Sequence, residues 1–507
     1  MNETVSSEIK ASPAPAESAN GGPPTRHLFW TVFPSIMLPM FLAVADQTIV
    51  ATALPAIASE LGQIERLSWV VVSYLIANTI AAPVYGRLGD SFGRRRMMFT
   101  ALGVFIAGSV ACAFAPSIEL LTLARVLQGL GGGGLMTLSQ ALVGETIPPR
   151  ERGRYQGYLA GVSVTSSTFG PIAGGYLTQT FGWRSIFLIN VPLGLVAALL
   201  VLRLATHPGD GRPTRFDAPG LVLFTLFVSP VILALEQVQR MEPDTLPLVA
   251  GLLAFGTIAL LALAWQEMHS NSPLIPPALF RDPSVWRSDG LAACHGAALV
   301  SLVTFLPIYL RAVRGTSPAE TGLLLLPLMF GIGIGSLVTG QLVTRTGRTA
   351  IFPSYGLSAA TVCLLLLAFF VPRLSVAQLP WVLSAATLCM GTVMGVVQVT
   401  VQAVAGQRML GTGAAMVQFS RSVGAAFGTA TVAAVLFSVL AARDREIANL
   451  LAAMIDHGPH AIATLSPARH AAVEAETSTA FRAAFATIAA FTAIGAWLAW
   501  SMPLRRV

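Results

Sequence analysis

Charged side chains are scarce in this chain: only 11% of its 507 residues are Asp, Glu, Lys or Arg, whereas soluble domains carry about 25%. Apolar residues make up 54%, and many apolar runs exceed the ~18–20 residues that cross a bilayer as a helix. This composition excludes a soluble globular protein. It predicts an all-α integral membrane protein with many spans.

Lysine is almost absent, since Lys10 is the single lysine among 31 basic residues. The formal charge of +7 therefore comes from arginines, and most of these lie at the ends of apolar runs, where they orient helices. The charge does not indicate a nucleic-acid partner. The four cysteines lack metal-ligand spacing, and neither a nucleotide-binding loop nor a nucleophile–base pair is present. These absences argue against a metal site, an enzyme and an ATP-driven pump.

Fourteen apolar runs are candidate membrane spans, and the arginines give them an orientation. With the N-terminus in the cytosol, the segments on that side hold nineteen Lys or Arg residues and the outer segments hold ten, as the positive-inside rule requires. An even number of spans then leaves both termini in the cytosol. The first run is too long for a cleaved signal and is expected to be retained. The span cores are 29–55, 68–86, 97–115, 119–142, 156–178, 185–205, 219–236, 246–266, 290–310, 322–343, 350–371, 380–402, 412–441 and 480–502.

The chain is expected to hold two six-helix bundles separated by two inserted helices. "GRLGDSFGRRR" (86–96) and "GQLVTRTGRTA" (340–350) share their glycine spacing, and parallel halves suit a rocking transporter. The outer loop begins with alternating charges, which predict either a tethered surface helix or a docking surface for an outer partner. The expected divisions are a disordered cytosolic tail at 1–27, the N-terminal bundle at 28–205, the inserted helices with their cytosolic loops at 206–289, and the C-terminal bundle at 290–507 with its outer loop 442–479.

Charge is concentrated in one stretch, "YGRLGDSFGRRRMMF" (85–99), which carries five charged residues within ten positions. Its glycines permit bends and close helix approach. Asp90 can cap the next helix or bind its N-terminal amides. Such a loop can latch two helical bundles at the inner face in one conformation only; a topology signal plus a tight turn is the alternative. The candidate latch residues are Gly86, Asp90, Gly93, Arg94 and Arg95.

This stretch resembles the loop signature of the major facilitator superfamily, Gly-x-Leu-Ala-Asp-x-x-Gly-Arg-Lys. The chain departs from it by Gly89 for Ala and Arg95 for Lys, and Thr344 stands at the Asp position of the second copy. Any latch at the second copy is therefore expected to be weaker or differently made. "LARVLQGLGGGGLM" (123–136) resembles the family's fourth-helix signature.

Two further stretches, "GWRSIFLINVPLG" (182–194) and "ADQTIVATALPAI" (45–57), are similar to the fourteen-helix drug:proton antiporters of that superfamily. The resemblance implies a major facilitator fold of two six-helix bundles plus two extra central helices, fourteen transmembrane helices in all. "GVSVTSSTFGPIAGGYL" (161–177) resembles the fifth-helix antiporter signature, which implies a hinge and a seal between halves; ordinary close packing is the alternative. Its candidate residues are Gly170, Pro171, Gly174 and Gly175.

Ionisable residues inside spans are the strongest functional candidates, because a charge at mid-bilayer costs roughly 2.5–3.5 kcal/mol. Asp46 lies well inside the first span and Arg125 inside the fourth. A change of surroundings between two conformations would let Asp46 bind and release a proton, and the resemblance implies proton coupling for Arg125. A permanent structural ion pair between the two is the alternative. His295 is interpreted more readily as a helix contact than as a proton relay.

The substrate cavity is expected to take hydrophobic or amphipathic compounds, because few acidic residues fall in the spans that would line it. No acid lies between Gly411 and Leu440, which argues against a preference for divalent cations. Arg421 is interpreted either as a cavity or gating charge or as a snorkelling side chain. The candidate cavity residues are Gln47, Tyr74, Asn78, Gln140, Phe305, Gln398, Gln402 and Arg421.

The leading hypothesis is a multidrug antiporter in the bacterial cytoplasmic (inner) membrane that exchanges protons for lipophilic small molecules by alternating access. It is expected to use no cofactor and to be driven by the proton gradient. The alternative is a dedicated exporter of one metabolite, such as an antibiotic, a fatty acid or a siderophore, and a third hypothesis is a receptor or scaffold on a transporter fold. If the host has two membranes, a periplasmic adaptor protein and an outer-membrane channel are candidate partners.

Overall fold

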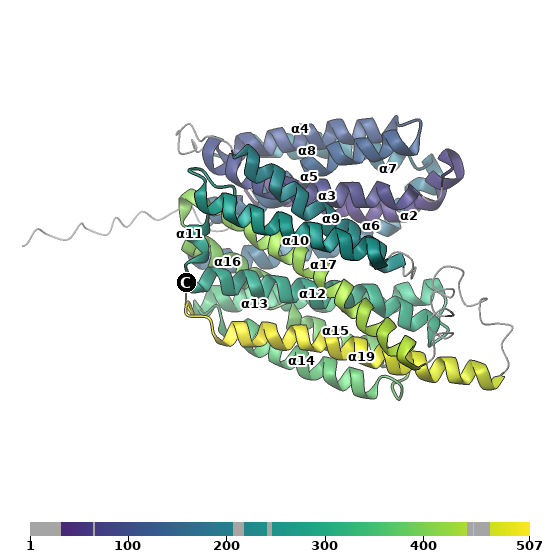
Figure 1. Ribbon diagram of the computed structural model, residues 1–507. Helices are drawn as coiled ribbons and strands as arrows, with labels where there is room; N and C mark the ends of the chain where they lie inside the picture. Colours follow the sequence, from purple (N-terminus) through teal and green to yellow (C-terminus); the bar gives the residue numbers. More distant parts are fainter. Residues whose placement is uncertain are drawn as a thin grey trace, which may run out of the picture.

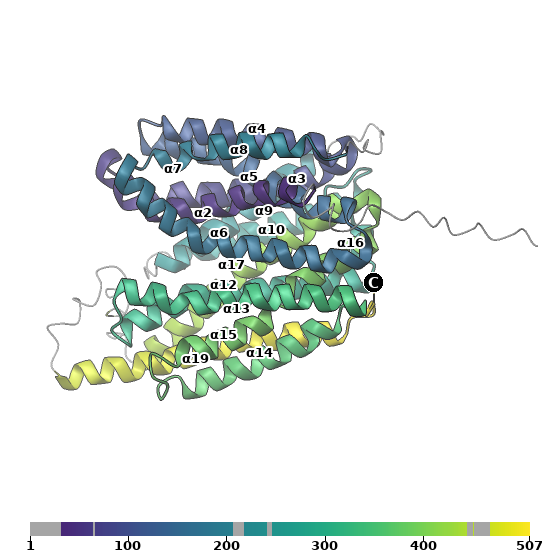
Figure 2. The same ribbon diagram turned by 180° about the vertical axis from the view of Figure 1, so that it is seen from behind.

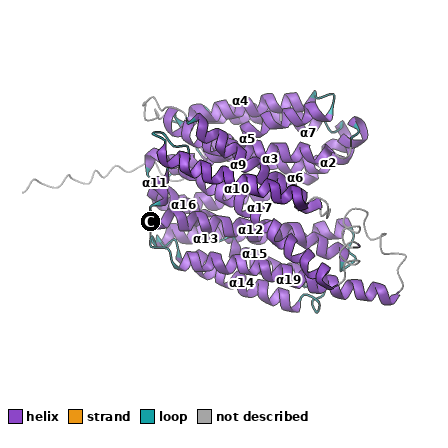
Figure 3. Ribbon diagram, viewed as in Figure 1, coloured by secondary structure: helices purple, strands orange, loops and turns teal. Residues whose placement is uncertain are grey.

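The computed structural model describes residues 32–63, 66–205, 217–240, 246–443, 450 and 467–506. Helices dominate these segments, and no strand occurs among them (Figure 3). The predicted all-α class is thereby confirmed. The expected tail 1–27 and the alternating-charge stretch of the outer loop fall outside the described residues, apart from a short helical part of that stretch.

The first half of the molecule is a bundle whose helices end at clear sequence signals. Ser117 caps the fourth long helix, because its Oγ accepts a hydrogen bond from the backbone N of Leu120 at 3.4 Å. Gly93 has φ 93°, a value that favours glycine, and it separates two helices that run in opposite directions. The helices are α2 (Phe33–Leu61), α3 (Leu67–Phe92), α4 (Arg94–Ala113), α5 (Ile118–Thr146), α6 (Arg152–Phe181), α7 (Ser185–Leu188) and α8 (Asn190–Val201).

The second half is a bundle of similar build, and Figure 1 shows it lying beside the first. A capping box begins one of its helices, since the Ser317 side chain and the Glu320 side chain each accept a bond from the other's backbone N. The helices are α11 (Pro277–Phe280), α12 (Pro283–Ala312), α13 (Pro318–Thr346), α14 (Ile351–Phe370), α15 (Leu379–Met390), α16 (Met394–Ala405), α17 (Leu410–Arg443) and α19 (Pro467–Trp500).

Helices α9 (Ala218–Arg240) and α10 (Leu246–His269) pack against each other, and α9 also packs against one helix from each half, α3 and α17. The rings of Phe224 on α9 and Phe419 on α17 have centroids 5.0 Å apart. Ile80 of α3 joins the same apolar cluster. The inserted pair therefore covers the junction of the two halves (Figure 1).

Each predicted span core overlaps a described helix, but several boundaries were wrong. Two spans are broken, one between α7 and α8 and the other between α15 and α16. The helix α12 begins at Pro283 rather than near 290, and α19 begins at Pro467, inside the expected outer loop 442–479. Hydropathy marks only the apolar part of a helix, whereas backbone hydrogen bonding continues into polar turns. Among the described helices, ten are long and apolar enough to cross a membrane.

The two halves meet most closely at one end of the molecule, here called the latch end and defined by Gly86, Asp90 and Gly411. A Cβ atom added at Gly86 would lie 2.6 Å from the carbonyl oxygen of Gly411, so the backbones of α3 and α17 nearly touch. From that end the ribbons of the halves diverge toward the opposite end (Figures 1 and 2).

Candidate functional site

Asp46 lies inside the first half, on α2, and is 2% exposed. Its Oδ2 accepts a hydrogen bond from Nη1 of Arg125 at 2.5 Å. Its Oδ1 accepts from Nε2 of Gln128 at 2.8 Å and from Nδ2 of Asn190 at 2.9 Å. Three helices, α2, α5 and α8, thus meet at one carboxylate, which three donors hold in a charge-assisted network.

Arg125 is held as firmly as its partner, with an exposed fraction of 1%. Its Nε donates to the carbonyl oxygen of Val70 at 3.1 Å, and its guanidinium lies 4.1 Å above the centre of the Tyr74 ring. The Tyr74 hydroxyl donates to the carbonyl oxygen of Ala43 at 3.2 Å. The buried charge is therefore paired and fully enclosed, as a charge in a low-dielectric interior requires.

The structure also places the latch residues. The carboxylate of Asp90 accepts hydrogen bonds from the backbone N of Gly411 and of Thr412, each at 2.9 Å. Asp90 therefore caps the N-terminus of α17 in the second half, where the positive end of the helix dipole favours an anion. Arg94 donates to Asp90 and to Glu145 at 2.6 Å, and to the carbonyl oxygen of Gln407 at 3.0 Å. Arg95 instead donates to Leu202 within the first half.

The second copy of the latch sequence makes a contact of another kind. The hydroxyl of Thr344 on α13 accepts from the backbone N of Arg154 at 3.1 Å. Gly153 and Gly340 allow α6 and α13 to approach closely beside it. The expectation of a differently made contact at this copy is therefore met by a neutral bond at the same end of the molecule.

The glycines of the fifth-helix signature differ in what they contact. A Cβ atom at Gly174 would lie 2.7 Å from the carbonyl oxygen of Ile49, and one at Gly170 would clash with the Oγ1 of Thr48, so both glycines pack α6 against α2 within the first half. A Cβ atom at Gly175 would meet nothing within 4 Å. Pro171 is exposed. In this conformation the signature joins two helices of one half.

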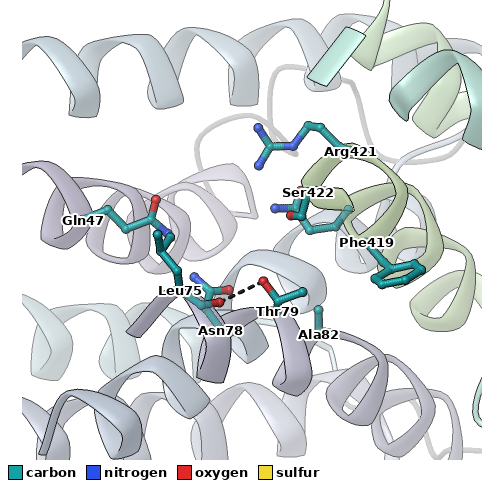
Figure 4. Close-up of a pocket in the computed structure, with 9 residues that line it drawn as sticks. Gln47, Leu75, Asn78, Thr79, Ala82, Phe419, Arg421 and Ser422 are labelled. Atoms are coloured by element: carbon teal, nitrogen blue, oxygen red, sulfur yellow. Dashed lines mark hydrogen bonds between the residues drawn. The ribbon is translucent and has the colours of Figure 1, made fainter. Parts of the chain in front are cut away.

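A cavity of about 270 Å³ lies between the halves and is lined from α2, α5, α6, α12, α13, α16 and α17. A smaller one of about 70 Å³ lies nearby, between α2, α3 and α17 (Figure 4). Methionine, leucine, isoleucine and valine side chains share the larger cavity with several glutamines. This mixture of apolar walls and a few polar groups suits an amphipathic small molecule.

The fold and the sequence agree on a family. The model of the Major Facilitator Superfamily matches residues 36–429, most of the chain. The chain belongs to this superfamily. It therefore has the fold of a membrane transporter, and proteins of this superfamily are not enzymes. The structure of a proton:xylose symporter of the superfamily superposes with a TM-score of 0.59 and 15% identity, over 94% of this chain and 96% of that one, which shows the shared fold.

Among curated relatives of the transporter, an uncharacterized MFS-type transporter of Mycobacterium tuberculosis (strain ATCC 25618 / H37Rv) is 35% identical over 86% of this chain and 64% of its own length. This chain thus spans less than two thirds of that relative. A multidrug transporter protein of Bacillus subtilis (strain 168) is 27% identical over 79% of this chain and 74% of its own length. The transporter therefore has multidrug transporters among its homologues.

The predicted cavity residues of the transporter are divided by the structure. Gln47, Gln140, Gln398 and Arg421 line the larger cavity, and Asn78 lines the smaller. The other three candidates line neither of the two. Tyr74 packs beneath Arg125, Phe305 is buried in the core of the second half, and Gln402 donates to the carbonyl oxygen of Gln140 at 2.8 Å. An aromatic or amide residue within a span does not reveal which way it faces.

Sequence reasoning missed part of the site. Asn190 and Ser109 complete the network around Asp46, since Ser109 Oγ accepts from Gln128 Nε2 at 2.8 Å. The signal for Asn190 was its position as an amide between apolar neighbours in "FLINVPLG". Asp289 was also missed, because it precedes the expected start of its span. Its carboxylate is 4% exposed, and neither oxygen has a hydrogen-bond partner among the described residues.

Proposed function

We propose that the transporter is a proton-coupled antiporter that exports hydrophobic or amphipathic small molecules by alternating access. The observation that carries this proposal is the Asp46 network, in which a buried carboxylate is held by Arg125, Gln128 and Asn190. Asp46 does not line the cavity, but the next residue, Gln47, does. A rotation of α2 that brings the carboxylate to the cavity would expose it to protons and separate it from Arg125.

The latch supports the alternating-access part of the proposal. The arginine distribution assigns the latch end to the cytosol, so this conformation is closed toward the cytosol. Opening that side requires Asp90 to leave the N-terminus of α17. Asp46 would then be protonated while the latch is closed, and the latch would be released in the separate step that opens the cytosolic side.

The finer family assignment belongs to the same proposal. We assign the transporter to the fourteen-helix drug:proton antiporters, with α5, α6, the α7–α8 pair and α9 as the spans beyond the ten that meet the length and apolarity criteria. The bacterial cytoplasmic membrane, cytosolic termini, and a periplasmic adaptor with an outer-membrane channel complete it. So does the division into a bundle at 28–205, the inserted helices, and a second bundle whose first long helix, α12, begins at Pro283 rather than at 290.

The test is Asp46→Asn in proteoliposomes loaded with a pH-sensitive dye, with chloramphenicol, an uncharged amphipathic compound, as the drug. Wild-type protein is expected to release protons when chloramphenicol is added, and Asp46→Asn to reduce that release at least tenfold. Glu60→Gln is the matched control, because Glu60 lies on the same helix but at its exposed end, paired with Arg184. Undiminished proton release by Asp46→Asn would refute the proposed coupling site.

A panel of unrelated drugs separates a multidrug pump from a dedicated exporter, which would respond to one compound.

A further inference from the structure

Arg421 occupies an unusual electrostatic position between the two halves. It lies on α17 and lines both cavities, and Figure 4 shows its side chain extending toward the side on which Gln47 lies. The described residues that line the two cavities include no Asp, Glu or Lys. His295 is the other ionisable residue among them. The cavities are therefore bordered by one positive charge and by no negative charge.

No acid neutralises Arg421 from within the described parts of the protein. The ion pairs found there join Arg66, Arg94, Arg125, Arg154 and Arg184 to acids, and none involves Arg421. Asp46 is committed to Arg125. Asp289 lies on α12 almost two turns before His295 and lines neither cavity. The charge of Arg421 thus lacks a partner in a region where an isolated charge is costly.

The packing of α12 against α17 fixes Arg421 at this place. Gly296 has no side chain, and a Cβ atom added there would clash with the carbonyl oxygen of Arg421. A Cβ atom at Gly424, one turn further along α17, would lie 2.5 Å from the carbonyl carbon of Ala293. This close backbone contact holds α17 so that Arg421 reaches the cavities rather than lipid. A snorkelling role does not fit a side chain that lines two internal cavities.

The larger cavity around Arg421 combines amide groups with apolar surface. Gln47, Gln140, Gln398 and Gln418 line the larger cavity together with Arg421, and Leu299, Met329 and Ile332 supply apolar surface there. Amides and a guanidinium donate hydrogen bonds that a carboxylate or sulfonate accepts, and arginine binds such groups with two parallel bonds. The volume of about 270 Å³ suits a compact body of one or two rings.

We infer that the transported compounds are amphipathic anions: an apolar body with one carboxylate or sulfonate that pairs with Arg421. The inference rests on the proposed export function and specifies the substrate class of the same cavity. It distinguishes this transporter from a pump for lipophilic cations, which a lone arginine would repel.

The experiment measures binding to the purified full-length protein by dye fluorescence, with no proton gradient. The probes are dansyl-glycine, dansyl-glycinamide and dansyl-ethylenediamine, which share one fluorophore and carry a carboxylate, a neutral amide and an ammonium group. Wild-type protein is expected to bind dansyl-glycine at least tenfold more tightly than dansyl-ethylenediamine. Arg421→Gln is expected to weaken dansyl-glycine binding about tenfold and to leave dansyl-glycinamide binding within twofold. Arg421→Lys is expected to retain most of the preference.

Arg373→Gln is the matched control, because it removes an exposed arginine from a turn away from the cavities and should leave all three affinities unchanged. The inference is overturned if wild-type protein binds the ammonium probe as tightly as the carboxylate, or binds none of the probes. Equal weakening of all three by Arg421→Gln, with a folded Arg421→Lys protein behaving likewise, also overturns it, because that result marks a structural role. Since binding is measured without a gradient, failure of proton coupling at Asp46 would not affect the outcome.

Discussion

Asp90 and Thr412 are 322 residues apart in the chain, yet one carboxylate oxygen of Asp90 accepts hydrogen bonds from both the backbone N of Thr412, at 2.9 Å, and its hydroxyl, at 3.0 Å. Asp90 belongs to the loop motif of the first half, whereas Thr412 lies in the first turn of α17 in the second. The charge of Asp90 and the N-terminus of α17 thus join the halves at one end.

Replacing Asp90 by Asn should weaken this junction. The amide keeps the size of the side chain but loses the charge, and hydrogen bonds to charged groups contribute roughly 1.5–3 kcal/mol where neutral ones contribute about 1. We expect the population closed at the latch end to fall about tenfold. Spin labels on the latch ends of α3 and α17 would show a longer distance. An unchanged distance distribution would contradict the latch.

Replacing Gly86 by Ala should prevent full closure of the same end. The added Cβ would lie 2.6 Å from the carbonyl oxygen of Gly411, which is backbone and cannot rotate away. We expect transport to fall at least tenfold while the protein remains folded. Gly103→Ala on α4 is the control, since a Cβ there meets nothing within 4 Å. That variant should keep its transport rate and gain up to about 1 kcal/mol of helix stability.

Arg125 and Asp46 should behave as a coupled pair in stability. Arg125→Gln leaves a buried carboxylate without its cation, and removing one partner of a buried ion pair costs roughly 3–5 kcal/mol. The double variant Arg125→Gln with Asp46→Asn removes both charges and should recover most of that loss, while proton release stays absent. Thermal unfolding of the purified variants measures the recovery. Additive losses in the double variant would show that the two residues act separately.

Neighbouring glycines of the fifth-helix signature should differ sharply in tolerance. Gly174→Val forces side-chain atoms against the backbone of Ile49, so we expect it to separate α6 from α2 and to abolish transport. Gly175→Ala meets open space in this conformation and should be tolerated. Substrate-driven flux is measured in both variants. If Gly175→Ala is as inactive as Gly174→Val, then Gly175 makes its contact in another conformation.

The sequence predicted the helices better than their faces. Apolar length located the long helices of the bundles, although it missed the short α11 and the breaks between α7 and α8 and between α15 and α16. The cost of burying charge singled out Asp46 and Arg125 before their partners were known. The same reasoning placed Tyr74 and Phe305 in the cavity, where the structure does not put them. A polar or aromatic residue inside a span has no sequence signal for its direction, because neighbouring helices on every side are apolar.

The amino-acid sequence by itself determined a helical membrane protein of a transporter superfamily, the glycine–aspartate–arginine pattern of its latch, and a buried acid within the first helix. Only the tertiary structure decided that Asp90 caps α17, that Asn190 completes the Asp46 network, and that Arg421 lines a cavity bare of acids among its described lining residues. The physical reason is that hydropathy and helix signals are local along the chain. A hydrogen bond or an unpaired charge, by contrast, depends on groups that meet only when distant helices pack.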